Sequence, residues 1–318
     1  MTRVGAIDCG TNSLRLLVAD RDADAQRDVH REMRVVRLGE GVDRTGELSA
    51  AALDRTRTAL VDYAALGRDL GVQAWRMVAT SASRDARNRE QFTAMVREVL
   101  GVDPEVVTGG EEAALSFNGA TRGLDPALGP FLVVDIGGGS TEFVLGDGGP
   151  QGGVSAAVSV DVGCVRLTER HLHGDPPTAA EVAAARADVL RALERVQAAV
   201  PVARARTVVG LAGSVTTVAA LALGLPAYDP ERIHLSRLPA GDALRVAEQL
   251  LAMTRAERSV LPAMHPGRVD VIGAGALVLC TALRALDLPE VLVSEADILD
   301  GIAWSVPEPR PTSDRRAR

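Results

Sequence analysis

Two short polar turns, far apart in the chain, carry the residues with the clearest chemical potential. They occupy residues 8–13 and 135–141, and each places an aspartate, Asp8 or Asp135, just before glycine and hydroxyl residues. Glycine lets backbone N–H groups approach a phosphate because it has no Cβ, and hydroxyl and amide side chains add donors. One such turn is typical of an ordinary hairpin. Two matching turns instead indicate a phosphate-binding cleft with the two aspartates facing each other, and its predicted phosphate ligands are Gly10, Thr11, Asn12, Ser13, Gly137, Gly138, Gly139, Ser140 and Thr141.

Carboxylates beside a phosphate site predict a divalent cation. Bare carboxylates would repel the substrate, whereas Mg²⁺ binds one or two carboxylates together with water and phosphate oxygens. We therefore expect Mg²⁺, or Mn²⁺, at Asp8 and Asp135. Glu142, directly after the second turn, is a further candidate for a metal or water contact, and an exposed strand glutamate is the alternative.

Hydrolysis of a phosphate compound also needs a base that deprotonates the attacking water. Glu111 and Glu112 fall in the first turn of an expected helix, where the helix dipole alone favours acids by roughly 0.3–1 kcal/mol. Glu111 is assigned to that helix-dipole effect, and Glu112 is the candidate base because no histidine is placed for the role. Arg84 follows an expected strand, where its guanidinium could grip phosphate oxygens bidentately. Ser214 resembles the N-cap of a helix whose start could bind an anion, and a plain cap is the alternative.

A scaffold of two similar halves must position these residues. Apolar runs flank each polar turn, at residues 4–19 and 131–146, so each turn is predicted to join the strands of a β-hairpin. The rest of the chain alternates helices and strands, which is typical of an α/β fold, and 318 residues suffice for two domains. Expected helices are 50–70, 87–100, 111–119, 179–200, 215–223, 240–253 and 269–286, and further expected strands are 75–80, 104–108, 154–162 and 207–211.

The composition excludes several classes of function. All 35 Lys+Arg residues are arginine, so Walker A loops, protein-kinase-type sites and pyridoxal enzymes, which need a lysine, are excluded. The formal net charge of -7, with only two Trp, two Tyr and four Phe residues, argues against a nucleic-acid partner.

The same composition predicts a cytoplasmic protein with no membrane partner. The longest apolar stretch, residues 271–283, is too short to span a bilayer, and no leader pattern is present. Cys9, Cys164 and Cys280 lack CxxC spacing and are expected to be buried thiols in a reducing compartment. Helices 179–200 and 271–286 could supply a homodimer interface, with burial in the core as the simpler alternative.

Six ordered motifs together resemble those of the exopolyphosphatase / guanosine pentaphosphate phosphatase (Ppx/GppA) family. They read IDCGTNS, TSASRDARN, TGGEEA, VDIGGGSTE, DVGCVRLTE and GLAGSVTT, and they cover nearly the whole chain. That family belongs to the actin, sugar kinase and Hsp70 superfamily, so the resemblance implies two ribonuclease-H-like α/β domains around an interdomain cleft. The expected domains are residues 1–120 and 121–297, with residues 298–306 packing back onto the first and a disordered tail at 307–318.

The resemblance also implies roles for individual residues. By position, Glu112 is the catalytic base, Asp135 and Glu142 hold the metal or the water, and Arg84 binds phosphate. The implied reaction is hydrolysis of the terminal phosphoanhydride of inorganic polyphosphate. Removal of the 5′ γ-phosphate of guanosine pentaphosphate (pppGpp) is the alternative, and a polyphosphate or alarmone sensor with little turnover is another.

Departures from the family pattern bear on the choice of substrate. Ala114 stands where some relatives have arginine, and AGS and SEADILDG replace commoner loop sequences. The chain resembles the short, two-domain actinobacterial-type members, so a channel for long polymers is not expected.

Overall fold

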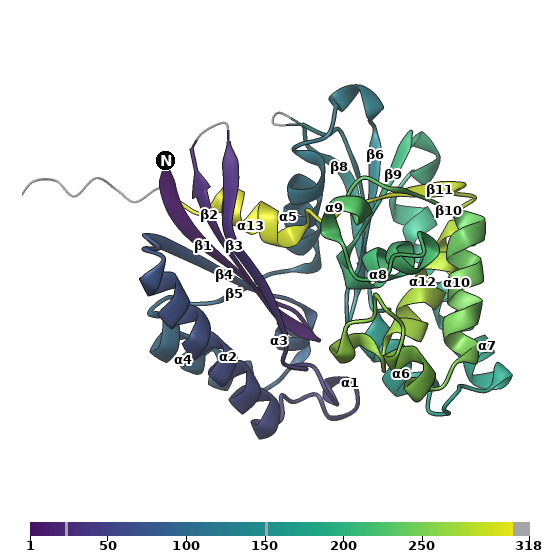
Figure 1. The fold of residues 1–318 in the computed structure, drawn as a ribbon, viewed down its shortest axis with the longest axis horizontal. Coiled ribbons are helices and arrows are strands. Elements are labelled where there is room, and N and C mark those ends of the chain that lie inside the picture. The colour runs from purple at the N-terminus through teal and green to yellow at the C-terminus, as the bar shows by residue number, and fades with distance from the viewer. Residues whose placement is uncertain (23–24, 150–151, 308–318) are drawn as a thin grey trace, which may run out of the picture.

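Two mixed β-sheets with the same strand order form the centre of the fold (Figure 1). The structure is a computed structural model, and it describes residues 1–22, 25–149 and 152–307. The first sheet has the order β3-β2-β1-β4-β5, and the second has the order β10-β11-β9-β6-β7-β8. In each, an antiparallel three-stranded meander is followed by two strands that pair in parallel. The edge strand β10 of the second sheet pairs antiparallel with β11. The strands of the first sheet are β1 (Thr2–Cys9), β2 (Ser13–Arg21), β3 (Gln26–Val35), β4 (Ala74–Ala79) and β5 (Glu105–Val106).

The second sheet repeats the first and adds one edge strand. Its members are β6 (Phe131–Ile136), β7 (Thr141–Gly146), β8 (Val154–Val160), β9 (Thr207–Leu211), β11 (Glu290–Val293) and the added edge strand β10 (Arg237–Pro239). The two hairpins expected from the sequence, β1–β2 and β6–β7, therefore occupy equivalent central places in a duplicated α/β fold.

Helices cover the outer face of each sheet. In the first lobe, α2 (Ala50–Asp69) and α4 (Arg89–Leu100) bury apolar residues that include Leu60, Tyr63 and Phe92. In the second lobe, α7 (Ala179–Ala199), α10 (Ala240–Ala252) and α12 (Ile272–Ala285) share a core with α6 (Cys164–His171) and α8 (Ala212–Ala222).

Burial decides between the two interpretations of the helix near residues 271–286. α12 is buried at each position from Ile272 to Leu283, so it is a core helix and offers no dimer surface. None of the helices in the described ranges is long and apolar enough to cross a membrane.

Two helices cross between the lobes (Figure 1). α5 (Gly109–Thr121), assigned to the first domain from the sequence, packs on the second sheet, where Phe117 joins the cluster around Phe131. α13 (Ile298–Ser305) follows the second sheet in the chain but packs on the first, where Ile302 contacts the β1 and β2 core. We keep the two-domain division as a proposal, with these helices as the crossing segments; the expected tail from residue 308 onward lies outside the described residues.

Glycines allow α5 and α13 to lie in direct backbone contact. A Cβ on Gly119 would lie 1.8 Å from the carbonyl oxygen of Asp297, and a Cβ on Gly301 would lie 2.1 Å from that of Leu115. Real Cβ atoms cannot approach so closely, so neither position accepts a side chain without moving the backbone. The contact fixes the start of α13 beside the helix that carries Glu112.

Candidate active site

The two glycine-rich turns meet at the ends of β1 and β6. A Cβ on Gly138 would lie 2.8 Å from Cβ of Thr11, and Thr11 shares a 2.9 Å hydrogen bond with Ser81. One cavity lies between the turns, and Asp8, Asp135 and Glu112 all line it. The other predicted residues that line it are Gly10, Thr11, Asn12, Ser13, Gly137, Gly138, Ser140 and Ser214.

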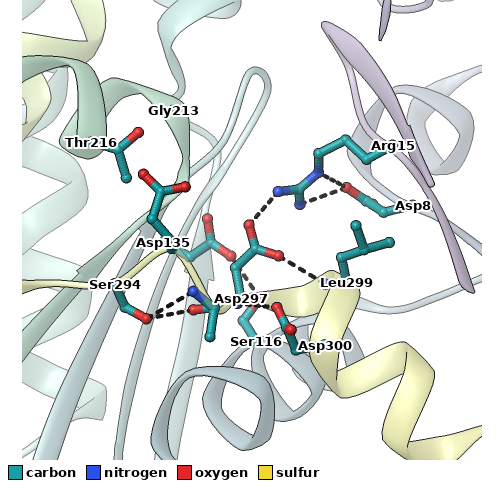
Figure 2. Close-up of polar contacts among 12 residues, drawn as sticks. Asp8, Arg15, Ser116, Asp135, Gly213, Thr216, Ser294, Asp297, Leu299 and Asp300 are labelled. Carbon is teal, nitrogen blue, oxygen red and sulfur yellow. Dashed lines mark hydrogen bonds and ion pairs between the residues drawn. The ribbon is translucent and has the colours of Figure 1, made fainter. Parts of the chain in front are cut away.

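Arg15 is a central cation of this cavity that the sequence analysis missed (Figure 2). Its Nε donates to Oδ2 of Asp8 at 2.9 Å, and its Nη2 forms an ion pair with the same oxygen at 2.7 Å. Its Nη1 donates to Asp297 at the start of α13. Arg15 lies directly opposite Asp8 in the β1–β2 register, as Glu142 lies opposite Asp135 in the β6–β7 register. The repeated hairpin could have revealed Arg15 from the sequence, because Glu142 was singled out at the equivalent position of the second hairpin.

Glu112 lies in the first turn of α5 with its carboxyl almost fully buried. Burial raises the pKa of Glu112 to about 7, and the guanidinium of Arg84 opposes this shift. Nη1 of Arg84 donates to Oε2 of Glu112 and to the carbonyl of Val107, both at 3.0 Å. A carboxyl with a pKa near neutrality, held in a fixed orientation, suits a general base.

Arg84 therefore makes a different contact from the one expected. It was predicted to grip phosphate, but it does not line the cavity, and its guanidinium instead pairs with the Glu112 carboxyl. In this structure Arg84 orients the candidate base.

Asp135 receives a 2.6 Å hydrogen bond from the hydroxyl of Ser116 on α5 (Figure 2). The pKa of Asp135 is raised to about 6, mainly by burial and also by the nearby charge of Asp297, whereas Ser116 and Arg15 act to lower it. Burial also raises the pKa of Asp8 despite its pairing with Arg15. Carboxyl groups that repel one another in one buried cavity create a place where a cation is stabilised.

One atom in particular fits a divalent metal. Oδ1 of Asp8 is buried and has no hydrogen-bond partner among the described residues, although a buried carboxylate oxygen normally has one. No group of three or more His, Cys, Asp or Glu side chains is arranged as a metal site in the described ranges. Mg²⁺ accepts such a sparse set because it binds one or two carboxylates and completes its shell with water and phosphate oxygens. The residues present thus fit Mg²⁺ at Asp8 and Asp135.

Besides Arg84, three further predicted residues lie outside the cavity. Glu142 lies on β7, one strand beyond Asp135. Its side chain is buried, so the alternative of an exposed strand glutamate is wrong, and it accepts a 2.6 Å hydrogen bond from Ser159. Burial and the charges of Glu112 and Asp135 raise its pKa. Thr141 donates its hydroxyl to the carbonyl of Val162, and Gly139 turns its carbonyl to Arg166.

Ser214 lines the cavity, but its expected role as an N-cap is wrong. α8 begins at Ala212, one turn earlier than predicted, so Ser214 lies inside the first turn and makes no capping bond. Ala212 has a φ of 64°, a backbone conformation that ends β9 abruptly. The guanidinium of Arg268 instead packs against the start of α8 and donates to Gly213 O and to Thr217. A Cβ on Gly213 would clash with this guanidinium.

The raised pKa of Glu112 gives a pH prediction for the metal-free protein. The unfolded chain ionises this carboxyl near 4.5, whereas the folded protein keeps the proton up to about pH 7. The folded state therefore binds more protons, and stability falls as the pH rises between these values. Glu112→Gln removes this titration. In calorimetry with a chelator, the melting temperature of Glu112→Gln relative to wild type is expected to rise from pH 4.5 to pH 7 and then level off.

Glu111→Gln is the matched control, with the opposite sign. The backbone N–H of Thr108 donates to the Glu111 carboxylate at 2.8 Å and lowers its pKa. The folded state favours the ionised form, so Glu111→Gln is expected to lose stability relative to wild type as the pH rises toward 4.5 and to stay level above it. Parallel trends in the two variants would contradict the assigned burial of Glu112.

The duplicated sheets, with a phosphate-sized cavity between two glycine-rich turns, define an α/β protein built from two similar halves. The chain belongs to the Ppx/GppA phosphatase family, whose signature matches residues 17–306.

Individual relatives agree with this assignment. The chain is 54% identical to "Exopolyphosphatase 2" of Mycobacterium tuberculosis, covering 96% of this chain and 99% of that protein. It is 29% identical to "Guanosine-5'-triphosphate,3'-diphosphate pyrophosphatase" of Aeromonas salmonicida, covering 95% of this chain and 58% of that one. Among solved structures, an exopolyphosphatase-like protein has a TM-score of 0.91 at 42% identity, covering 96% of this chain and 98% of the other. The Aquifex aeolicus family member has a TM-score of 0.79 at 31% identity, with 96% and 97% covered.

Proposed function

We propose that the protein is a metal-dependent exopolyphosphatase, which hydrolyses the terminal phosphoanhydride bond of inorganic polyphosphate and releases orthophosphate. The observation that carries the proposal is that the buried carboxyl of Glu112 shares one cavity with two opposed phosphate-type turns and with Asp8 and Asp135. The name of the relative at 54% identity supports the same activity.

Glu112 acts as the general base in this proposal. It takes a proton from a water molecule while the water oxygen bonds to the terminal phosphorus and the bridging P–O bond breaks. The shortened chain leaves with the bridging oxygen, and the released phosphate contains the oxygen of the water. Arg84 keeps the Glu112 carboxylate oriented toward the cavity through its 3.0 Å bond.

The turns hold the phosphoryl group that is attacked. Residues 10–13 of one turn and Gly137, Gly138 and Ser140 of the other line the cavity. Their hydroxyls and free backbone N–H groups would supply donors for equatorial phosphate oxygens. Mg²⁺ at Asp8 and Asp135, when bound, would neutralise the charge that develops on phosphate oxygens. Arg15 and Arg268 add fixed positive charge, which a chain without lysine must obtain from arginine.

Cavity size suggests where the rest of the substrate lies. The cavity between the turns measures about 100 Å³, room for a phosphoryl group and a few waters. A second cavity of about 460 Å³ shares Arg15 and Arg268 with it. The remaining phosphates of the bound chain would extend from the first cavity into the second. Its walls also include Met33, Tyr228 and Met264, which favours pppGpp as a second candidate substrate because such a wall suits a nucleoside.

The test is orthophosphate release with Mg²⁺ from polyphosphates of defined length, from pppGpp and from ATP. We expect kcat/KM to be highest for polyphosphate. A higher value for pppGpp would assign the alternative activity. Tight binding with no phosphate release from any of the three would show a sensor and contradict the enzyme proposal.

We also propose that the protein acts in the cytoplasm. Cys9, Cys164 and Cys280 are buried free thiols, which suits a reducing compartment.

A further inference from the structure

The motif DVGCVRLTE, at residues 161–169, has no role in the chemistry described so far, yet it contacts the second glycine-rich turn directly. The first turn of α6 donates backbone hydrogen bonds to the turn, from Cys164 N to Gly137 O at 3.0 Å and from Val165 N to Gly138 O at 2.9 Å. Nε of Arg166 donates to the next carbonyl, Gly139 O, at 2.7 Å. Three successive carbonyls of the turn therefore point toward α6.

Peptide planarity gives these contacts a consequence for the cavity. In a trans peptide the N–H points opposite to the C=O of the same unit, and the cis peptides of the described residues lie elsewhere. The N–H groups of Gly138, Gly139 and Ser140 must therefore point away from α6. Such a run of N–H groups in a turn can bind an anion, and Arg166 fixes its last member by holding Gly139 O.

The same guanidinium also binds the other lobe. Nη1 of Arg166 donates to Asp43 at 2.6 Å, in α1 (Val42–Thr45), and Nη2 donates to Asp85, in α3 (Ser81–Asp85). The Arg166 side chain is only 13% exposed, so its three acceptors replace water almost entirely. Each of the three guanidinium nitrogens thus donates a hydrogen bond either to the turn or to the first lobe.

We propose that Arg166 is a positioning residue that links closure of the two lobes to the orientation of the second phosphate-binding turn. When Asp43 and Asp85 hold the guanidinium, its Nε fixes the Gly139–Ser140 peptide with the N–H directed at the phosphate. When the lobes separate, the acids release Arg166 and the last peptide of the turn is free to rotate. The inference rests on the proposed function for its phosphate ligand.

Arg166→Gln tests this role against a matched control, Arg170→Gln. Arg170 also pairs with Asp43, at 2.6 and 2.8 Å, but makes no contact with the turn. We expect Arg166→Gln to lower kcat/KM for polyphosphate by about 10- to 100-fold, as for a misaligned anion-binding donor. We expect Arg170→Gln to change it by less than about fivefold, as for a partly exposed ion pair. Equal effects of the two substitutions would overturn the proposal.

Binding of inorganic phosphate, measured by calorimetry, separates this inference from the proposed function. Arg166→Gln is expected to weaken phosphate binding about tenfold or more, even if wild type hydrolyses no substrate tested. Unchanged phosphate affinity in Arg166→Gln would refute the positioning role whatever the hydrolase activity.

A second variant covers the case in which Arg166→Gln does not fold. The Asp43→Asn/Asp85→Asn double variant keeps Arg166 and its bond to Gly139 but removes both acidic partners. It is expected to raise the radius of gyration in small-angle X-ray scattering and to raise KM more than it lowers kcat. An unchanged radius together with an unchanged KM would show that the acids do not hold the lobes together.

Discussion

Glu112→Gln is expected to lower kcat for phosphate release by about 10²–10⁴-fold, the range that a general base contributes. Glutamine keeps the shape of the side chain and can still meet Arg84, so binding of the substrate should change little and KM should stay within a fewfold of wild type. The loss arises because the amide cannot accept the proton of the attacking water. Initial rates of orthophosphate release under saturating Mg²⁺ measure the effect.

Glu111→Gln provides the comparison for this experiment. Glu111 lies one residue earlier in the same helix turn, but its carboxylate caps Thr108 on the protein surface. We expect it to retain near-wild-type kcat. Full activity of Glu112→Gln would mean that another group deprotonates the water.

Asp135→Asn is expected to lower kcat/KM on the order of 100-fold and to raise the Mg²⁺ concentration needed for half-maximal activity. The substitution removes one of two carboxylates that fit the cation, and a metal ion supplies several kcal/mol of stabilisation to developing phosphate charge. Titration of activity with Mg²⁺ measures the shift, and calorimetric binding of Mn²⁺ measures it without turnover.

Ser116→Ala is expected to lower Mn²⁺ affinity and kcat/KM by less than Asp135→Asn does. It leaves the Asp135 carboxylate but removes the 2.6 Å hydrogen bond that orients it, and loss of such a partner typically costs about 10- to 100-fold in metal affinity or activity. Equal Mn²⁺ affinity in Asp135→Asn and wild type would place the metal elsewhere.

The duplicated hairpins were predictable because they combine local signals at two places. Apolar runs around a turn that begins Asp-x-Gly identified β1–β2 and β6–β7, and both sheets share one strand order. Glu112 was singled out because its helix carries an acid where a base is needed, and its role as the base stays a prediction. These inferences depend on residue type and spacing, which the sequence contains directly.

Residues whose roles depend on tertiary contacts could not be placed in the same way. β3 was not expected because QRDVHREMRV carries charges throughout and is half-buried or exposed, so no apolar alternation marks it. The partner of Arg84 depends on how α5 lies against the first lobe, and the position of Ser214 depends on a helix that starts one turn early. Asp297 contacts Arg15 only because α13 returns to the first sheet.

The central claim is that water attacks the terminal phosphorus of a polyphosphate chain in the cavity between the two turns. Hydrolysis in ¹⁸O-labelled water, followed by mass spectrometry of the products, tests it most directly. The account predicts one ¹⁸O atom in each released orthophosphate and none in the shortened chain. Label in the shortened chain, or orthophosphate without label, would contradict it.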